Sequence, residues 1–127
     1  MNVILSIRPT FCQSIFEGKK VYEYRKKVFK RTDIDRVYIY VTKPICKIVG
    51  YFTIAAMIED KPSKIWEITY KGSGISKEYF DAYFSGCDIA CAIVIGEVVK
   101  FDTSIDPKEV IKNFTAPQSF MYVDKDL

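Results

Sequence analysis

The chain has 127 residues, of which 49% are hydrophobic and 28% charged, and a formal net charge of +3. This balance is typical of one globular domain and excludes a disordered or fibrous chain. The longest uncharged apolar stretch, residues 48–58, is shorter than the roughly 20 residues that span a bilayer. The amino terminus lacks the basic start and long apolar stretch of a signal peptide. We therefore expect one soluble, cytoplasmic domain over residues 1–127, without a membrane partner.

The first half of the chain predicts four strands and one helix. The strands are the segments richest in β-branched and aromatic residues: residues 2–7, 21–29, 36–42 and 47–59. The helix covers residues 9–17, because Pro9 suits a first helical turn and Gly18 suits a helix end. Gly50, inside the fourth strand, is expected to mark a bulge.

The second half predicts three short helices and two strands. In chain order they are a helix over residues 63–70, a helix over 77–84, a strand over 89–101, a helix that begins at Pro107 and a strand over 119–123. Pro62 opens the first of these helices, and Ser76 and Asp106 are suited to cap the other two. The strand at 89–101 is almost continuously apolar, which is typical of a central strand.

The order of these elements, β-α-β-β-β-α-α-β-α-β, indicates the fold class. Three strands follow one another without a helix between them, which excludes a parallel sheet of the Rossmann type. We expect an α+β fold in which six short strands form a mixed or antiparallel sheet. Such a sheet, curled into a small β-barrel with helices at its rim, accommodates this order.

Four cysteines and the lack of histidine restrict the chemistry. Cys12, Cys46, Cys87 and Cys91 lie in apolar contexts. They are either buried reduced thiols or, together, a zinc site in which the last two supply a C-x3-C pair. Because the first two are isolated and no histidine is present, we favour thiols and expect no metal and no cofactor. Without histidine, a serine or cysteine nucleophile also lacks its usual general base.

Basic residues are concentrated in the first part of the chain. Residues 1–50 hold 11 Lys and Arg against 4 Asp and Glu, a net of +7, whereas residues 51–127 hold 8 against 12, a net of −4. The densest run is "EGKKVYEYRKK", residues 17–27. In a strand, its Glu23 and Arg25 share one face at a separation of about 7 Å. They form either a solvated surface ion pair or an acid that orients an arginine toward an anion, with Lys20 just before them.

The run also carries a family signature. Residues 18–25, "GKKVYEYR", fit the pattern G-x-K-x-x-E-x-R of the ASCH domain, a PUA-like β-barrel family, through Gly18, Lys20, Glu23 and Arg25. The signature follows a strand, an "IRP" and a helix, as it does in ASCH domains. A further segment, "VYIYVTKPICKIVGYF", resembles the second and third strands of the family. Two more, "SGISKEYFDAYFSG" and "APQSFMYV", are similar to segments of a bacterial and phage-borne ASCH subgroup. The resemblance thus covers nearly the whole chain.

The resemblance implies that the domain binds nucleic acid, most often RNA, in a basic cleft beside the signature. Some similar proteins are described as predicted transcriptional regulators. Other ASCH proteins are hydrolases, among them ribonucleases and a branch that hydrolyses N4-acetylcytidine with a threonine at the acidic signature position. Because Glu23 occupies that position here, we expect no acetylcytidine hydrolysis.

Two functions remain open, a non-catalytic module that binds RNA or another single-stranded nucleic acid, and a small hydrolase with Lys20 and Glu23 as an acid–base pair. Four cations are candidates for phosphate contacts: Arg8, Lys20, Arg25 and Lys43. The candidates for base stacking are Tyr22, Tyr24, Tyr40 and Trp66. The candidates for hydrogen bonds to bases are Glu23, Gln118 and Ser119. Most other aromatic residues are expected in the core, among them the helical set Tyr79, Phe80, Tyr83 and Phe84.

Overall fold

One sheet of six strands forms the frame of the computed structural model, which describes all of residues 1–127. The strands are β1 (Asn2–Ile7), β2 (Tyr22–Arg25), β3 (Val37–Val41), β4 (Lys47–Asp60), β5 (Ala90–Ile105) and β6 (Phe120–Val123). Across the sheet their order is β2-β5-β4-β3-β1-β6. β1 is parallel to β3 and the other neighbours are antiparallel, so the mixed sheet expected from the sequence is confirmed.

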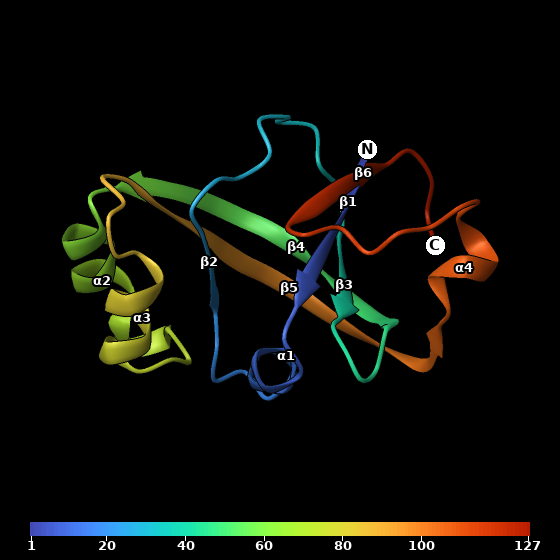
Figure 1. Cartoon of the computed structure of the whole chain (residues 1–127), viewed down its shortest axis with the longest axis horizontal. Coiled ribbons are helices and arrows are strands. Elements are labelled where there is room, and N and C mark those ends of the chain that lie inside the picture. Colours follow the sequence, from blue (N-terminus) through green and yellow to red (C-terminus); the bar gives the residue numbers. More distant parts are fainter.

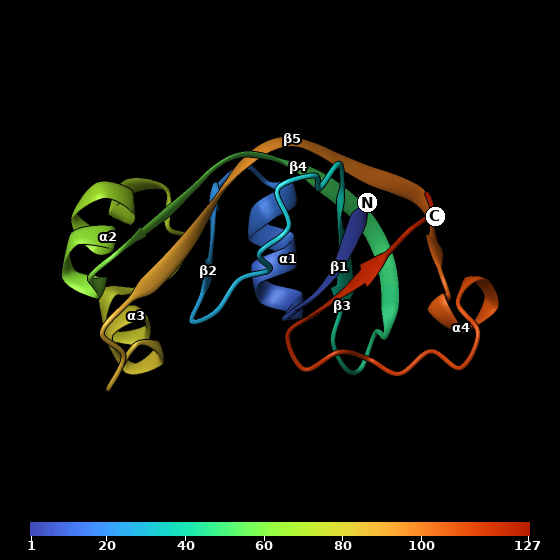
Figure 2. The same cartoon turned by 90° about the horizontal axis from the view of Figure 1, so that it is seen from above.

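The helices lie inside the curl of the sheet and at its two ends. They are α1 (Pro9–Phe16), α2 (Pro62–Thr69), α3 (Lys77–Tyr83) and α4 (Pro107–Val110), with a short 3-10 turn, Tyr70–Gly72, after α2. β4 and β5 run side by side through the length of the molecule and bend over α1 (Figures 1 and 2). α2 and α3 lie at one end of this curved ribbon and α4 at the other. The structure therefore confirms an α+β half-barrel with helices at its rim.

Two strands end four residues away from their predicted ends, and strand pairing explains both differences; the other strand ends lie within one residue of the prediction. β2 ends at Arg25, four residues before the predicted end, because its register pairs Arg25 with Cys91, next to the first residue of β5. The residues after Arg25 therefore have no strand to pair with. β5 instead continues to Ile105, four residues beyond the predicted end, because Ile105 pairs with Ile48 of β4.

The sheet is buried on both faces near β1 and β3. On the face toward α1, alternate residues of the two strands pack against Cys12 and Ile15 of that helix: Val3, Leu5, Ile7, Val37, Ile39 and Val41. On the other face, Ile4, Tyr38 and Tyr40 pack under the segments that follow β5. Strands buried on both faces are rigid supports, so side chains at their ends are held in defined positions.

The bulge expected at Gly50 is present in the pairing of β4. Gly50 pairs with Ile39 of β3, but the next pair joins Ile48 to Tyr40, so the register skips one residue. A Cβ atom on Gly50 would lie 2.2 Å from the carbonyl oxygen of Val99 on β5. The close approach of the two strands at this point therefore requires glycine.

Candidate functional site

The side chain of Arg25 bridges the two edges of the sheet. Its Nη2 donates to the carbonyl oxygen of Ser6 on β1 at 2.8 Å, and its Nη1 lies 3.5 Å from Ser119 Oγ, next to β6. Arg25 itself ends β2, the opposite edge strand. We call this gap between the edges, closed by side chains, the seam. The curl of the sheet thus brings the signature of β2 against the first and last strands of the chain.

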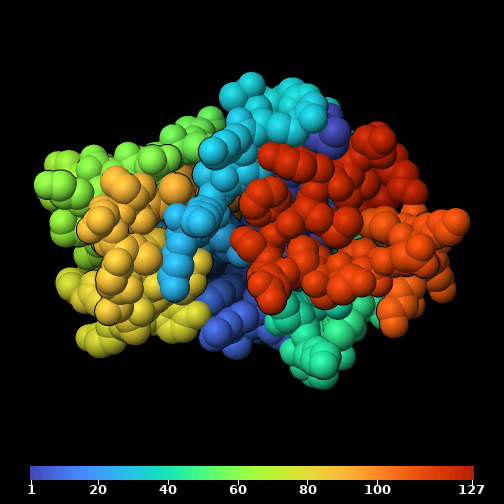
Figure 3. All heavy atoms as spheres, turned by 45° about the horizontal axis from the view of Figure 1, so that its top comes forward, coloured from blue at the N-terminus to red at the C-terminus, as the bar shows by residue number.

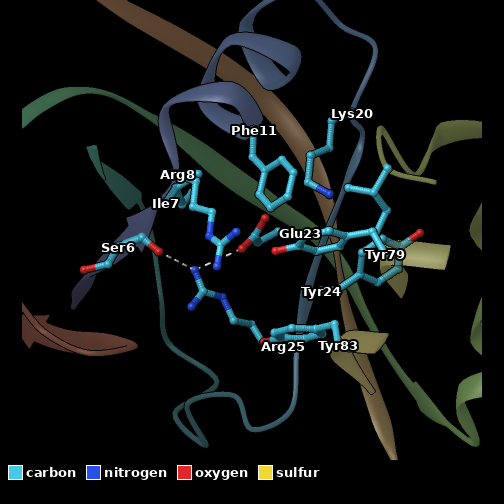
Figure 4. Close-up of a pocket in the computed structure, with 11 residues that line it drawn as sticks. Ser6, Ile7, Arg8, Phe11, Lys20, Glu23, Tyr24, Arg25, Tyr79 and Tyr83 are labelled. Carbon is cyan, nitrogen blue, oxygen red and sulfur yellow. Dashed lines mark hydrogen bonds and ion pairs between the residues drawn. The ribbon is translucent and has the colours of Figure 1, made fainter. Parts of the chain in front are cut away.

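Glu23 holds Arg25 in the seam. Glu23 Oε2 lies 2.9 Å from Arg25 Nη2, and the two side chains are 7% and 11% exposed. The two residues share a face of β2, as the alternation of the strand predicted (Figure 4). The pair is therefore buried and oriented, and the alternative of a solvated surface ion pair is wrong.

Arg25 keeps one donor free of protein contacts. Its Nε is buried and has no acceptor within the chain. A buried donor without an acceptor costs about 1–3 kcal/mol. The contacts of Arg25 within the seam therefore leave its guanidinium group incompletely satisfied.

A cavity of about 120 Å³ adjoins the ion pair. Its polar lining contains three cationic side chains and one carboxylate: Arg8, Lys20, Arg25 and Glu23. Figure 4 shows the guanidinium groups of Arg8 and Arg25 and the carboxylate of Glu23 directed toward one another at its centre. We call this space the seam cavity. Its excess of cations predicts a negatively charged occupant.

Lys20 reaches the seam cavity from a buried position. The residue is 2% exposed, and its Nζ donates to the carbonyl oxygen of Ser73 at 2.8 Å. The same Nζ lies 4.8 Å from the ring centroid of Tyr24 and 5.2 Å from that of Phe11. Burial lowers the pKa of Lys20 to about 8; Glu23 opposes this shift and Arg25 adds to it. A lysine in this state exchanges its proton near neutral pH.

A glycine turn closes over Lys20. Gly74 has a φ of +67°, in the left-handed region, and a Cβ atom there would lie 2.5 Å from Lys20 Cβ. Glycine is therefore required both for the backbone conformation and for the close approach. The turn places the Ser73 carbonyl oxygen on the lysine, so the sequence "GSG" before α3 is part of the site.

Tyr79 and Tyr83 also line the cavity, although the sequence pattern predicted them in the core. α3 buries Phe80 and Phe84 against Tyr24, and turns the two half-buried tyrosines toward the seam. Burial raises the pKa of Tyr83, while Arg25 opposes the shift. Both pairs of aromatic residues have the same i, i+4 spacing, so the sequence alone does not tell the pair at the cavity from the buried pair.

The structure brings together five of the eight predicted binding residues and places three elsewhere. Arg8, Lys20, Glu23 and Arg25 line the cavity, and Ser119 contacts Arg25. Tyr40, Lys43 and Gln118 do not line it. Tyr40 is 6% exposed and packs against Phe114, and burial raises its pKa to about 12. Lys43 and Gln118 are exposed in connecting segments. The roles of all eight residues stay predictions.

The residues predicted to stack on bases are also divided between the cavity and other parts of the fold. Tyr24 lines the cavity, but its ring also packs on Phe80 at 5.1 Å, and its hydroxyl lies 2.7 Å from that of Thr69. Trp66 packs on Phe80 at 4.9 Å, at the end of the molecule formed by α2 and α3. Tyr22 belongs to the same cluster. Tyr79 and Tyr83 are therefore better placed than these three to contact a ligand.

No group of three or more His, Cys, Asp or Glu side chains lies together, and all four cysteines are free. None of the helices is both long and apolar enough to cross a membrane.

Comparison with known proteins identifies the family. Residues 5–101 match the sequence model of the ASCH domain. The chain belongs to the ASCH domain family. A Zymomonas mobilis protein named "ASCH domain-containing ribonuclease" is 26% identical over 98% of this chain and 86% of its own length. The crystal structure of ASCH from Zymomonas mobilis matches with a TM-score of 0.90 at 25% identity, over 98% of this chain and 88% of that one.

Two further relatives contain an ASCH-like segment within a longer protein. The chain is 33% identical to the large ribosomal subunit protein uL22 of Ureaplasma parvum over 125 residues, which cover 96% of this chain but 39% of that protein. It is 27% identical to the ATP synthase subunit alpha of the same organism over 124 residues, which cover 15% of that protein. The similar segment thus occurs in two proteins whose names indicate different functions.

We expect Arg25→Met to lower the free energy of unfolding by about 3–5 kcal/mol, because it leaves the Glu23 carboxylate buried without its cation. The double variant Glu23→Gln with Arg25→Met should recover part of this loss, since a neutral amide is cheaper to bury. Urea unfolding at pH 7 measures both. Equal stabilities of the single and double variants would contradict the buried ion pair.

Lys20→Met should instead stabilise the chain. Because burial lowers the pKa of Lys20 from its ordinary value of 10.5 to about 8, its charge costs on the order of 3 kcal/mol at neutral pH. Loss of the bond to Ser73 offsets about 1 kcal/mol, which leaves a net gain of about 1–2 kcal/mol. The gain should be full below pH 8 and shrink as the pH rises toward 10.5. Lys19→Met, at an exposed neighbouring position, is the control; a destabilised Lys20→Met at pH 7 would refute this account.

Proposed function

We propose that this ASCH domain binds single-stranded RNA and holds one phosphate in the seam cavity. The observation that carries the proposal is the convergence of Arg8, Lys20 and Arg25 on one cavity that contains a single carboxylate. Lysine and arginine charges are rarely buried unless they have a partner. Here Glu23 is the one carboxylate beside the three cations, and an RNA phosphate would supply a further negative charge.

The size and lining of the cavity favour a single strand. Its volume of about 120 Å³ is well below the 300 Å³ or more of a pocket for a drug-sized ligand. It therefore admits one group of a nucleotide at a time. Tyr79 and Tyr83 present rings at its edge, and an unpaired base can stack on such a ring, whereas the bases of a duplex are already stacked on each other.

We propose RNA instead of DNA as the ligand because of the name that one relative carries. The Zymomonas mobilis protein that matches over nearly the whole chain is named a ribonuclease. A regulatory role, as in the transcriptional regulators that the family resemblance implies, would act through the same RNA contact.

Cleavage of the bound RNA is the second candidate function. The name of the Zymomonas relative and the low pKa of Lys20 both favour it. In a cleavage without metal, a base takes the proton of the ribose 2′-hydroxyl as its oxygen attacks phosphorus, and an acid protonates the leaving 5′-oxygen. Lys20 in its neutral form would take the proton of the 2′-hydroxyl, and water would protonate the leaving 5′-oxygen. Arg25, oriented by Glu23, would stabilise the charge on the phosphorane.

The binding proposal predicts a specific change in salt dependence. Lys20→Met and Arg8→Gln should each weaken binding of a short single-stranded RNA and reduce the slope of log K against log salt by roughly one, because each removes one phosphate contact. Fluorescence anisotropy between 50 and 200 mM salt, at pH 7, measures the slope. Lys19→Met removes the same charge one residue away, at an exposed position. It should change the affinity and the slope much less than the two site variants do. Parent-like binding by both site variants would exclude the seam cavity as the phosphate site.

The cleavage candidate is tested with 5′-labelled single-stranded RNA in the presence of a chelator. We expect cyclic-phosphate products whose rate rises with pH toward about 8 and is lost in Lys20→Met, because the proton-transferring amine is missing. A substrate with 2′-deoxyribose at the cleaved position should bind without being cut. If the chain binds the ribose substrate without cleaving it, the binding function stands and the nuclease function is excluded.

A further inference from the structure

The segment that joins β2 to β3, residues 26–36, forms a basic surface beside the seam. It holds five cations and two carboxylates, a net of +3: Lys26, Lys27, Lys30, Arg31, Arg36, Asp33 and Asp35. Figure 3 shows this segment, drawn in light blue and cyan, between the yellow atoms of the α3 region and the red atoms of the C-terminal segment. We call it the basic loop. The sequence pattern had assigned its beginning to a strand, so its position across the seam was not predicted.

An aromatic row fixes the basic loop to β6. Phe29 is 3% exposed and its ring packs on Phe120 at 5.5 Å. Phe120 in turn packs on Tyr122 at 5.6 Å, and Tyr122 is 39% exposed. The guanidinium carbon of Arg31 lies 5.8 Å from the centroid of the Tyr122 ring. The loop therefore presents an exposed ring and a cation on a buried aromatic anchor.

The basic loop and β6 both lie close to the seam cavity. Lys26 Nζ lies 4.9 Å from the ring centroid of Tyr83, which lines the cavity. Ser119, which contacts Arg25, is three residues before Tyr122, about 10 Å along an extended strand. A chain bound in the cavity thus reaches Tyr122 within a few nucleotides.

We propose that the basic loop is a second nucleotide subsite, in which an unpaired base stacks on Tyr122 and Arg31 contacts a neighbouring phosphate. The proposal rests on the proposed function and extends it to the path of the strand outside the cavity. Stacking on an exposed ring accepts any base, and the cations supply contacts that depend on salt. Asp33 binds Arg31 through two bonds of 2.6 and 2.8 Å and so orients its guanidinium group beside the ring.

The test compares oligonucleotides of two lengths. Fluorescein-labelled U2 occupies the cavity alone, whereas U8 extends over the basic loop. Tyr122→Ala should weaken U8 binding roughly tenfold and leave U2 binding unchanged, because it removes one stacked base. Arg31→Ala should reduce the salt slope for U8 by about one but not for U2. Tyr70→Ala is the matched control, since Tyr70 is 49% exposed on the turn after α2, away from the seam.

Photocrosslinking of the unmodified chain gives an independent readout. A U8 probe with 5-iodouridine at successive positions should crosslink to Tyr122 from one or two positions only. Equal affinities of the parent and Tyr122→Ala for U8, or crosslinks elsewhere, would overturn the second subsite while Lys20→Met and Arg8→Gln still test the cavity. If the parent chain binds neither U2 nor U8, the proposed function fails and this subsite fails with it.

Discussion

The buried ion pair of Glu23 and Arg25 is the contact on which the arrangement of the site depends. A curled sheet with two edges must close its gap by backbone pairing or by side chains. Here one arginine does so, because its guanidinium group reaches Ser6 and Ser119 from the opposite edge strand. The pair cannot lose one member without leaving the other charged and buried. The geometry of the edges and the electrostatics of the cavity are therefore set by one interaction.

Lys20 is a second position at which the site lowers the stability of the folded chain. Lys20 lies among Phe11 and Tyr24, beneath a turn that only Gly74 allows, and burial lowers its pKa. A methionine would fit such surroundings at a lower cost. A charged group kept where an apolar one is more stable is typical of functional sites, in which binding of an anion restores the favourable state of the cation.

Sequence reasoning predicted the elements, the signature and the shared face of Glu23 and Arg25, but not which aromatic side chains line the cavity. The strand order, the bulge at Gly50 and the cap at Ser76 follow from local signals, and all are present. The position of Tyr79 and Tyr83 at the cavity does not follow from local signals, because α3 is buried on one side and faces the cavity on the other. Tyr40 illustrates the opposite case, since strands buried on both faces lack the alternation that tells a core ring from an exposed one.

The open seam also explains how one fold can serve different activities. If β2 and β6 were joined by backbone hydrogen bonds, their pairing would fill the space that the cavity occupies. Because side chains close the gap instead, residues there other than Arg25 can change without breaking a backbone hydrogen bond of the sheet. The signature position of Glu23 is one example: a threonine there would remove the buried carboxylate, free Arg25 and place a hydroxyl beside Lys20. Fold and chemistry are thus separable at this site, because the strands fix the positions of side chains whose charge and hydrogen bonding can differ.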